Sequence, residues 1–308
     1  MKNTIKIDES KKKILIIGAN GFLGSNFLKL LEEEHLSRQS FSFIAADLEN
    51  THIDPKIPYC NIDITNKENT TEKILEISPD VIILTAAMTD VDQCEINKEL
   101  ATRINTNGPI NVVKTCEKIN CKLVCISTDF VFDGKLEGRY YTEEDLPNPL
   151  SHYAKTKYNA EVAIKNSSIN YLICRSAVLY GWNPNKLNFI TWILEKLRKN
   201  EELSVVTNQI NNPTFVPNLA ELILKLIEKS ACGIYHTAGD IPMTRYEMAL
   251  KCAGVFEYDH NLIRPIETFE QYAIRPKNAG LDITKLKNLI GSELPILSLE
   301  EGLKIMRR

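Results

Sequence analysis

Two residues with complementary acid–base chemistry stand four positions apart in the stretch SHYAKTK. They are Tyr153 and Lys157, and the pair Asn148–Pro149 before them predicts a helix start, which puts both side chains on one helical face. A free phenol has a pKa near about 10, and a neighbouring ammonium lowers it. Such a tyrosine can donate a proton to a carbonyl that receives hydride. The spacing alone is also typical of an ordinary surface helix.

A hydroxyl and an amide elsewhere in the chain could complete this site. Thr128 ends a predicted strand in STDFVFDG, where it could bond a substrate oxygen or cap its own backbone. Asn105, in RINTNGP, could support a water link to Lys157 or serve as a helix-packing amide. His152 adjoins Tyr153 but points about 100° away around the helix, so we assign it no catalytic role.

A glycine triplet predicts a phosphate-binding turn near the N-terminus. In IIGANGFLGSNF, Gly18, Gly21 and Gly24 lie between the first predicted strand and the first predicted helix. One glycine permits the tight turn, one lets the backbone approach a pyrophosphate, and one lets helix and strand pack closely. The helix N-terminus then offers N–H groups to the anion. The competing interpretation is a purely structural turn.

Two acidic residues follow in positions that suit an adenosine. Asp47 ends the second predicted strand, where its carboxylate can accept hydrogen bonds from ribose hydroxyls and would repel a 2′-phosphate. It therefore favours NAD(H), with NADP(H) still possible, unless it is simply a solvated strand end. Asp63, in NIDIT, could contact adenine with Ile64 packed beside it.

The elements that must position these residues alternate between apolar strands and helical patterns. This order predicts an α/β fold, a doubly wound Rossmann parallel sheet with a smaller, discontinuous C-terminal substrate-binding lobe. We expect a solvated leader over 1–11, a dinucleotide-binding domain over 12–180 plus about 205–240, and a substrate lobe over about 181–204 plus 241–308. The expected strands are 13–18, 41–47, 80–87, 122–128, 171–176 and 233–239, and the expected helices 24–35, 96–119, 188–199 and 217–229.

Composition narrows the class of protein. The chain has 308 residues, is 44% hydrophobic and carries a net charge of −3, which favours neither nucleic acid nor an anionic membrane as a partner. Its eight cysteines include no C-x-x-C pair and fit reduced core thiols of a cytoplasmic protein. We find no apolar run long enough to span a bilayer, no signal peptide and no metal-ligand spacing.

Taken in order, the motifs resemble one enzyme family. G-x-x-G-x-x-G, TAAMTDVDQCE, STDFVFDG, NPLSHYAKTK, NNPTFVPNLA and RPKNAGLD together look like the extended short-chain dehydrogenase/reductase superfamily. Within it they resemble the dTDP-4-dehydrorhamnose reductase (sugar-nucleotide 4-ketoreductase) family, over about residues 12 to 300. The resemblance implies a reductase that moves hydride from a nicotinamide cofactor to the 4-keto group of a nucleotide-linked deoxysugar.

The resemblance also implies residue roles. Thr128, Tyr153 and Lys157 would be catalytic, with Tyr153 and Lys157 also touching the cofactor. Arg275, in IRPKNAGLD, could pair its guanidinium with a substrate diphosphate or form a surface salt bridge. The other cofactor contacts would be Gly18, Asn20, Gly21, Phe22, Leu23, Asp47, Asp63, Ile64, Ala86, Ala87 and Asn105. The substrate would face Thr89, Phe130, Val178 and Arg275, and Pro213 and Thr214 are further candidate contacts near the cofactor.

Departures from the family pattern fall mainly on the sugar-facing wall. The family usually has tyrosine at Phe130 and at Met88, often tryptophan at Val178, and asparagine at Thr85. Two other readings therefore stay open. An epimerase or dehydratase is disfavoured because Asp129 is followed by Phe130, not by a second acid. A cofactor-binding regulatory subunit resembling that of methionine adenosyltransferase is the non-catalytic alternative. The arrangement of copies is also open, with a homodimer as one option.

Overall fold

The computed structural model describes residues 11–30, 41–51, 56–184, 186–268 and 270–308. The predicted leader, apart from residue 11, and positions 31–35 of the first predicted helix lie outside these ranges. In the part of the chain that is described, no helix is long and apolar enough to cross a membrane, and no three His, Cys, Asp or Glu side chains gather as they would around a metal ion. All eight cysteines are free thiols.

The chain divides into two compact units whose segments interleave. The first unit comprises residues 1–127, 156–173 and 230–233, and the second comprises 128–155, 174–229 and 234–308. The domains expected from the sequence were defined by the ligand that each would bind, whereas these units are defined by contacts. The expected domain division therefore stays a prediction. We describe each unit by itself.

A seven-stranded sheet confirms the predicted α/β class. Its strand order, β11-β6-β5-β4-β1-β2-β3, places β1 beside both β2 and β4, and these pairs run parallel, as do β2–β3 and β4–β5. Parallel strands buried on both faces need continuous apolar runs, and β1 and β4 have them. The strands are β1 Lys12–Ile17, β2 Phe41–Asp47, β3 Tyr59–Asn61, β4 Val81–Leu84, β5 Lys122–Thr128, β6 Tyr171–Ser176 and β11 Gly233–His236.

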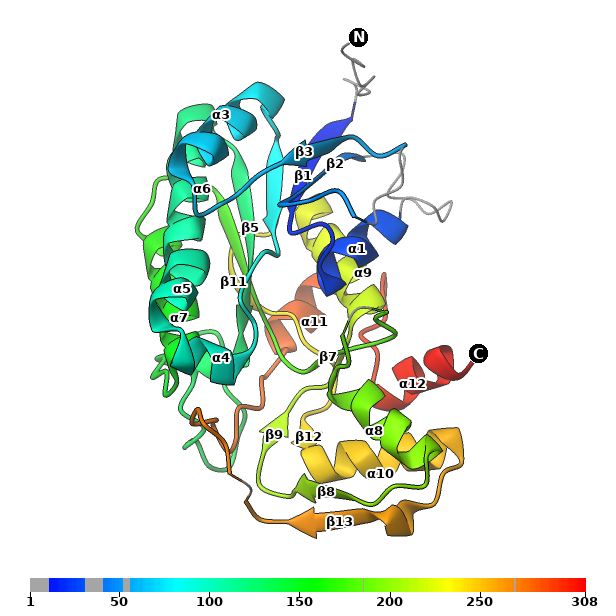
Figure 1. Cartoon of the computed structure of the whole chain (residues 1–308). Coiled ribbons are helices and arrows are strands. Elements are labelled where there is room, and N and C mark those ends of the chain that lie inside the picture. Colours follow the sequence, from blue (N-terminus) through cyan, green and yellow to red (C-terminus); the bar gives the residue numbers. More distant parts are fainter. Residues whose placement is uncertain (1–10, 31–40, 52–55, 185, 269) are drawn as a thin grey trace. The chain divides into compact units, whose positions relative to one another are not determined.

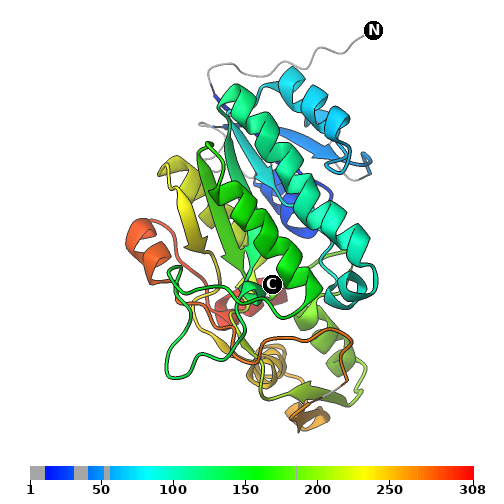
Figure 2. The ribbon, with the colours of Figure 1, turned by 90° about the vertical axis from the view of Figure 1, so that its left-hand side faces the viewer.

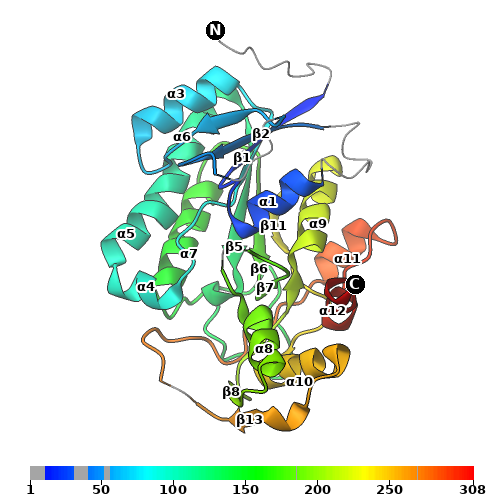
Figure 3. The ribbon, with the colours of Figure 1, turned by 45° about the vertical axis from the view of Figure 1, so that its right-hand side comes forward.

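Helices of the first unit cover both faces of its strands. Figure 1 places α1 (Phe22–Lys29) on one face and α3 (Lys67–Ile77) with α6 (Gly108–Ile119) on the other, and Figure 3 agrees. Figure 2 looks onto the second face, where α3 and α6 lie side by side. The winding therefore reverses between β1 and β4, and ligands of such sheets bind beyond the carboxyl ends of the strands at this switch point.

The helix expected over 96–119 is interrupted. The structure has α4 (Val91–Ile96), α5 (Lys98–Thr102), a π-helical turn over Arg103–Asn107 and then α6. In the π-turn the N–H of Gly108 bonds the carbonyl of Arg103, five residues back. Such turns insert one extra residue into a helix and are frequent at functional sites. A sequence pattern with continuous helical character does not reveal this insertion.

The start of α7 (His152–Lys165) corrects a sequence prediction. Asn148 and Pro149 do not begin the helix, because the Asn148 side chain donates to Asp133 Oδ2 at 3.0 Å. Ser151 acts as the cap, and its Oγ accepts from the Ala154 N–H at 3.3 Å. The helix therefore begins three to four residues later than predicted, and Tyr153 falls in its first turn, with Lys157 one turn further on.

The second unit packs helices and short sheets around its own apolar core. Leu194, Ile193, Met248, Cys252 and Leu303 are among its buried members, contributed by α8, α10 and α12. Figure 1 shows α8 and α10 beside the parallel pair β8–β13. The elements are β7 Leu179–Tyr180, α8 Phe189–Arg198, β8 Leu203–Val206, β9 Ile210–Asn211, β10 Thr214–Phe215, α9 Val216–Glu228, β12 Met243–Thr244, α10 Arg245–Phe256, β13 Ile263–Ile266, α11 Thr284–Ile290 and α12 Leu299–Arg307, with 3₁₀ turns over Asp129–Val131 and His260–Leu262.

Candidate functional site

The turn after β1 has backbone contacts that only glycine permits. Gly18 adopts φ +93°, and a Cβ there would lie 2.5 Å from the N of Ala86. A Cβ on Gly24 would lie 2.1 Å from the Gly18 carbonyl oxygen. Gly21 is less constrained, since a Cβ on it would lie 3.0 Å from the same oxygen. Gly18 thus provides the tight turn and Gly24 the close helix–strand approach, two of the three expected roles.

The N-terminus of α1 leaves its backbone donors available. Gly21 is the N-cap, no side chain caps the helix, and no acidic residue lies in the first turn. Leu23 is buried against the sheet, while Asn20 and Phe22 are partly exposed. Free N–H groups and the helix dipole at such an end favour an anion. This is the chemistry expected of a pyrophosphate turn.

Asp47 lies directly beside this turn. Its Oδ2 accepts from the Asn20 N–H at 2.9 Å and its Oδ1 accepts from the Leu48 N–H at 2.8 Å. Each carboxylate oxygen has a second lone pair, so further donors can still be accepted. These backbone hydrogen bonds fix the orientation of the Asp47 carboxylate. The sequence placed this residue at a strand end but could not give its orientation.

Asp63 and Ile64 are held by local packing. Asp63 Oδ1 accepts from the N–H and the hydroxyl of Thr65, both at 2.8 Å, which makes a tight turn ahead of α3. Ile64 is buried against Gly108, where a Cβ would lie 2.6 Å from its Cδ1. Both residues follow β3, as expected, but their contacts within the unit are structural.

The segment after β4 runs close to the glycine turn. The expected strand over 80–87 ends at Leu84, because the N–H groups of Thr85 and Ala86 both bond the carbonyl of Ile17. The Thr85 hydroxyl donates to the carbonyls of Ile17 and Gly18, each at 3.0 Å. Ala86 and Ala87 are half-buried at this edge, while Thr89 is exposed. Sequence reasoning missed this role of Thr85.

Asn105 holds this segment and α7 together. Its Oδ1 accepts from the Met88 N–H at 2.8 Å, and its Nδ2 donates to the Met88 carbonyl at 2.9 Å and to Thr156 Oγ1 at 3.3 Å. The residue is 1% exposed. The sequence left two roles for the Asn105 amide, support of a water link to Lys157 or helix packing. In the structure the amide makes packing contacts, and one of its partners, Thr156, directly precedes Lys157 in the chain.

Lys157 is a buried cation of the first unit, with 6% of its surface exposed. Burial raises the pKa of the Cys94 thiol to about 11, and the charge of Lys157 partly offsets this. Burial likewise raises the pKa of Cys125, again opposed by Lys157. The ammonium therefore lies close to two neutral thiols, so neither cysteine neutralises its charge at physiological pH.

In the second unit, Thr128 belongs to a buried polar network. Its hydroxyl donates to Asp129 Oδ1 at 3.1 Å and accepts from the Phe130 N–H at 3.2 Å. Asn211 Nδ2 donates to Asp129 Oδ2 at 2.6 Å. Burial raises the pKa of Asp129 to about 6, despite opposing effects of Asn211, Arg245 and Thr128. Asn211 and Arg245 were missed, because they lie far from the motif in sequence and carry no local signal.

Phe130 and Tyr153 meet edge to face. Their ring centroids are 6.2 Å apart at 83°, and both side chains are partly exposed. Phe130 thus supplies an apolar edge to the phenol, at a position where a tyrosine would add a hydroxyl. This contact joins Phe130 of STDFVFDG to Tyr153 of SHYAKTK, and both residues belong to the second unit.

The remaining predicted positions differ in character. Val178 has φ +43°, a strained conformation for a β-branched residue, and its carbonyl accepts from the Thr214 N–H at 3.0 Å. Thr214 is 2% exposed, and its hydroxyl accepts from the Gly239 N–H at 3.1 Å, so together with Pro213 it forms a buried connection. Arg275 instead lines a cavity of about 240 Å³.

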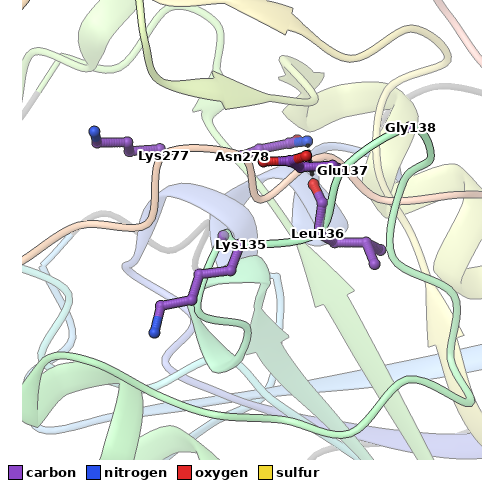
Figure 4. Close-up of a pocket in the computed structure, with 7 residues that line it drawn as sticks. Lys135, Leu136, Glu137, Gly138, Lys277 and Asn278 are labelled. Carbon is purple, nitrogen blue, oxygen red and sulfur yellow. Dashed lines mark hydrogen bonds between the residues drawn. The ribbon is translucent and has the colours of Figure 1, made fainter.

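A second hollow of the second unit contains none of the predicted site residues. Its volume is about 680 Å³, and Figure 4 shows that the Lys135 and Lys277 side chains extend away from each other there. Asn278 Nδ2 donates to the Leu136 carbonyl at 3.1 Å, closing one wall. The lining residues are Gly134, Lys135, Leu136, Glu137, Gly138, Lys277 and Asn278. Nothing in this surface loop adds to the predicted chemistry.

Comparison with known proteins shows similarity along nearly the whole chain. The family described as RmlD substrate binding domain matches residues 12–306. A dTDP-4-dehydrorhamnose reductase of Aggregatibacter actinomycetemcomitans is 30% identical over 91% of this chain and 93% of its own. Methionine adenosyltransferase 2 subunit beta of Rattus norvegicus is 32% identical over 97% and 89%. The crystal structure of dTDP-4-dehydrorhamnose reductase from Bacillus anthracis str. Ames in complex with NADP is 34% identical with a TM-score of 0.83, over 96% and 99%.

Proposed function

Since the chain belongs to the RmlD substrate binding domain family, we propose that it is an oxidoreductase that reduces the 4-keto group of a nucleotide-linked deoxysugar. The observation that carries the proposal is the pair on α7. Tyr153 is partly exposed in the first turn, and the buried cation Lys157 follows one turn later. Few structural roles require a buried ammonium on the same helical face as a phenol.

The first unit fits a nicotinamide dinucleotide. The glycine turn leaves space that a Cβ would fill, and the uncapped N-terminus of α1 suits a pyrophosphate. When bound, this cofactor supplies the hydride. Gly18, Asn20, Gly21, Phe22 and Leu23 would hold its pyrophosphate, with Asp47, Asp63, Ile64, Ala86, Ala87 and Asn105 lining the remainder. A carboxylate at Asp47 favours NADH, while a similar protein was solved with NADP.

Three side chains would act on the ketone. Tyr153 donates a proton to the oxygen as it gains negative charge, and Lys157 stabilises the resulting phenolate and holds a ribose hydroxyl. Thr128 orients the ketone. Because its hydroxyl proton is directed at Asp129, Thr128 must turn that proton toward the substrate before it can donate. Asp129 would then keep the hydrogen bond from Asn211.

The substrate wall is more apolar than that expected from the family pattern. Phe130 and Val178 of the second unit stand where hydroxyl and indole groups are common in the family, and Arg275 of the same unit would supply a polar contact. A wall of this kind suits the 6-methyl group of a deoxysugar better than a sugar with a 6-hydroxyl. We therefore propose a 6-deoxy-4-keto sugar as the substrate.

The decisive experiment measures oxidation of NADH and of NADPH with dTDP- and UDP-linked 4-keto-6-deoxysugars. We expect Tyr153→Phe to lower kcat by about 10²- to 10⁴-fold, because the proton donor is lost while the ring stays. Tyr158→Phe, on the same helix, is the matched control and should retain full activity. Equal activity of both variants would refute the role of Tyr153.

A second candidate function has support from another group of relatives. Methionine adenosyltransferase 2 subunit beta is as similar in sequence as the reductases, so this chain could instead bind a cofactor and regulate a partner protein. In that case NADPH would bind tightly, yet no 4-keto sugar would be turned over. Binding titrations beside the turnover assay separate the two functions.

A further inference from the structure

Thr128 has a single hydroxyl proton, and two groups would compete for it. In the structure this hydroxyl donates to Asp129 Oδ1 at 3.1 Å and accepts from the Phe130 N–H at 3.2 Å. A ketone oxygen that gains negative charge would need the same proton. Thr128 cannot donate to Asp129 and to the substrate at once, so its contribution to the proposed reaction depends on the state of Asp129.

Asp129 is held so that each of its oxygens has a different partner. The residue is 2% exposed, and its Oδ2 accepts from Asn211 Nδ2 at 2.6 Å. Because Oδ2 is engaged as an acceptor by this amide, a proton on the carboxyl is better placed on Oδ1. Oδ1 is the oxygen that contacts the Thr128 hydroxyl.

The two protonation states of this carboxyl orient the Thr128 hydroxyl in opposite ways. An ionised carboxylate can only accept, so it retains the Thr128 proton in a charge-assisted hydrogen bond. A protonated carboxyl can donate from Oδ1 to Thr128 Oγ1, which releases the Thr128 proton for a substrate oxygen. Thr128 Oγ1 would then accept from Asp129 and from the Phe130 N–H and donate once, which uses its full hydrogen-bonding capacity.

Both protonation states are accessible close to neutral pH. Burial raises the pKa of Asp129 to about 6, against the effects of Asn211, Arg245 and Thr128, which favour the ionised form. Arg245, at the start of α10, is the charged side chain of these three, and Arg275 acts in turn on Arg245. A modest change in pH therefore changes which form of Asp129 prevails.

We propose that Asp129 is a positioning residue: in its protonated form it turns the Thr128 hydroxyl toward the ketone, and in its ionised form it withdraws that hydroxyl. The inference rests on the proposed function. Asp129 keeps its proton throughout the reaction, because the proton that the forming alkoxide receives comes from Tyr153. Thr128 contributes one hydrogen bond to the substrate oxygen, so its withdrawal slows reduction without stopping it.

The test measures kcat/KM for reduction of a dTDP-linked 4-keto-6-deoxysugar from about pH 5.5 to about pH 8, since this parameter reports groups of the free enzyme. For the wild type we expect a decline of about 10- to 100-fold that begins near pH 6, because Thr128 loses its hydrogen bond to a charged oxygen. Asp129→Asn should lack the decline. An asparagine that accepts from Asn211 can donate to Thr128 as the protonated acid does, so above about pH 7 the variant should be faster than the wild type.

Two further variants show whether the effect passes through Thr128. Asn211→Ala removes a donor that favours the ionised form of Asp129, so the decline should begin at a higher pH. Thr128→Val should lower kcat/KM by about 10- to 100-fold at low pH and abolish the decline. Adding Asp129→Asn to Thr128→Val should change nothing further, whereas a structural role of Asp129 would give an additional loss.

Asp133→Asn is the matched control, because it makes the same acid-to-amide change in the same motif. Despite burial, hydrogen bonds from Tyr141 and Asn148 hold the pKa of Asp133 below its ordinary value, so this carboxylate stays ionised throughout the measured range. The control should keep the pH dependence of the wild type.

The outcomes separate this inference from the proposed reaction. Turnover with the same pH dependence in the wild type and Asp129→Asn would overturn the positioning role alone, as would an equal loss of activity at every pH. Absence of turnover with every keto sugar would overturn the proposed reaction and this inference with it. Thermal unfolding identifies a folding defect in Asp129→Asn. In that case Asn211→Ala decides, because an unshifted decline in this variant would overturn the inference.

Discussion

The glycine turn of the first unit and the polar network of the second are built on opposite principles. The turn over residues 18–24 is made by the backbone, and its shape follows from absent side chains. The network of Thr128, Asp129 and Asn211 is made by buried side chains drawn from separate segments, and the charge of Arg245 acts on Asp129. In the glycine turn, steric contacts determine the geometry. In the polar network, hydrogen bonds and the balance of charge determine it.

This difference determines what each region tolerates. A backbone site fails when any atom is added, whatever its charge. A buried polar network tolerates changes of shape that keep its hydrogen bonds, but it responds to pH because its members are costly to ionise. Substitutions that alter volume alone or charge alone should therefore affect the two regions differently.

The largest effect is expected for Gly24→Ala. The new Cβ would lie 2.1 Å from the Gly18 oxygen, so α1 must move away from β1. We expect a loss of about 4 kcal/mol or more in the free energy of unfolding, and loss of cofactor binding. Gly254→Ala is the matched control, because Gly254 lies in α10 with no atom near its Cβ direction, and it should stabilise by about 0.5–1 kcal/mol. Urea unfolding and NADPH titration measure both; similar stability of the two variants would contradict the steric account.

A smaller effect, dependent on pH, is expected for Asp129→Asn. The pKa of Asp129 is raised from 3.8 to about 6, so between these values the folded protein retains a proton that the unfolded chain has lost. The free energy of unfolding therefore falls as pH rises through this window, by about 3 kcal/mol for this group. Asparagine cannot ionise and should remove that decline.

Urea unfolding of the wild type and of Asp129→Asn at pH 4, 5, 6 and 7 provides the measurement. The difference in stability between the two proteins should shift in favour of the variant as pH increases. A constant difference across the series would mean that Asp129 ionises freely in the folded protein. The difference in stability between the wild type and Gly24→Ala should not depend on pH, because both proteins keep Asp129, and this distinguishes the two regions directly.

The smallest effect is expected where a side chain supports the backbone site. Thr85→Val keeps the shape but removes the hydroxyl that donates to the carbonyls of Ile17 and Gly18. We expect a loss of about 1 kcal/mol in the free energy of unfolding and weaker cofactor binding. Thr85→Ser restores the donor and should recover most of both. If Thr85→Val and Thr85→Ser have the same free energy of unfolding in denaturant titrations, the hydroxyl does not stabilise the turn.

Most of the sheet could be predicted because most of its strands are largely apolar. The strands expected at 41–47, 122–128 and 171–176 match β2, β5 and β6, and the parallel order confirms the Rossmann class. The strand expected at 13–18 is displaced by one residue, since Gly18 already belongs to the turn. The strand expected at 233–239 ends at His236. Local composition marks where a strand is buried, but tertiary hydrogen bonds determine where it ends.

Helix ends and side-chain networks were less accessible to sequence. Asn148–Pro149 has good capping chemistry, yet its amide bonds Asp133 and Ser151 caps α7 instead. From the sequence, Asp129 served only as an argument against a dehydratase, because the next residue is not a second acid. Its partners Asn211 and Arg245 lie about 80 and 115 residues away, and no periodic pattern marks such pairings. A sequence motif identifies functional residues within one segment. It does not identify the residues from distant segments that the fold places beside it.

The π-turn between α5 and α6 has a consequence for the register of the first unit. In an α-helix each backbone hydrogen bond reaches four residues back, whereas in this turn it reaches five. The helix before the turn is therefore rotated relative to α6 by about one residue, or 100°. The surplus residue directs Asn105 inward, toward Met88 and Thr156. Removing one residue here would rewind the helix and turn that amide to another face, without changing any residue that the motifs identify.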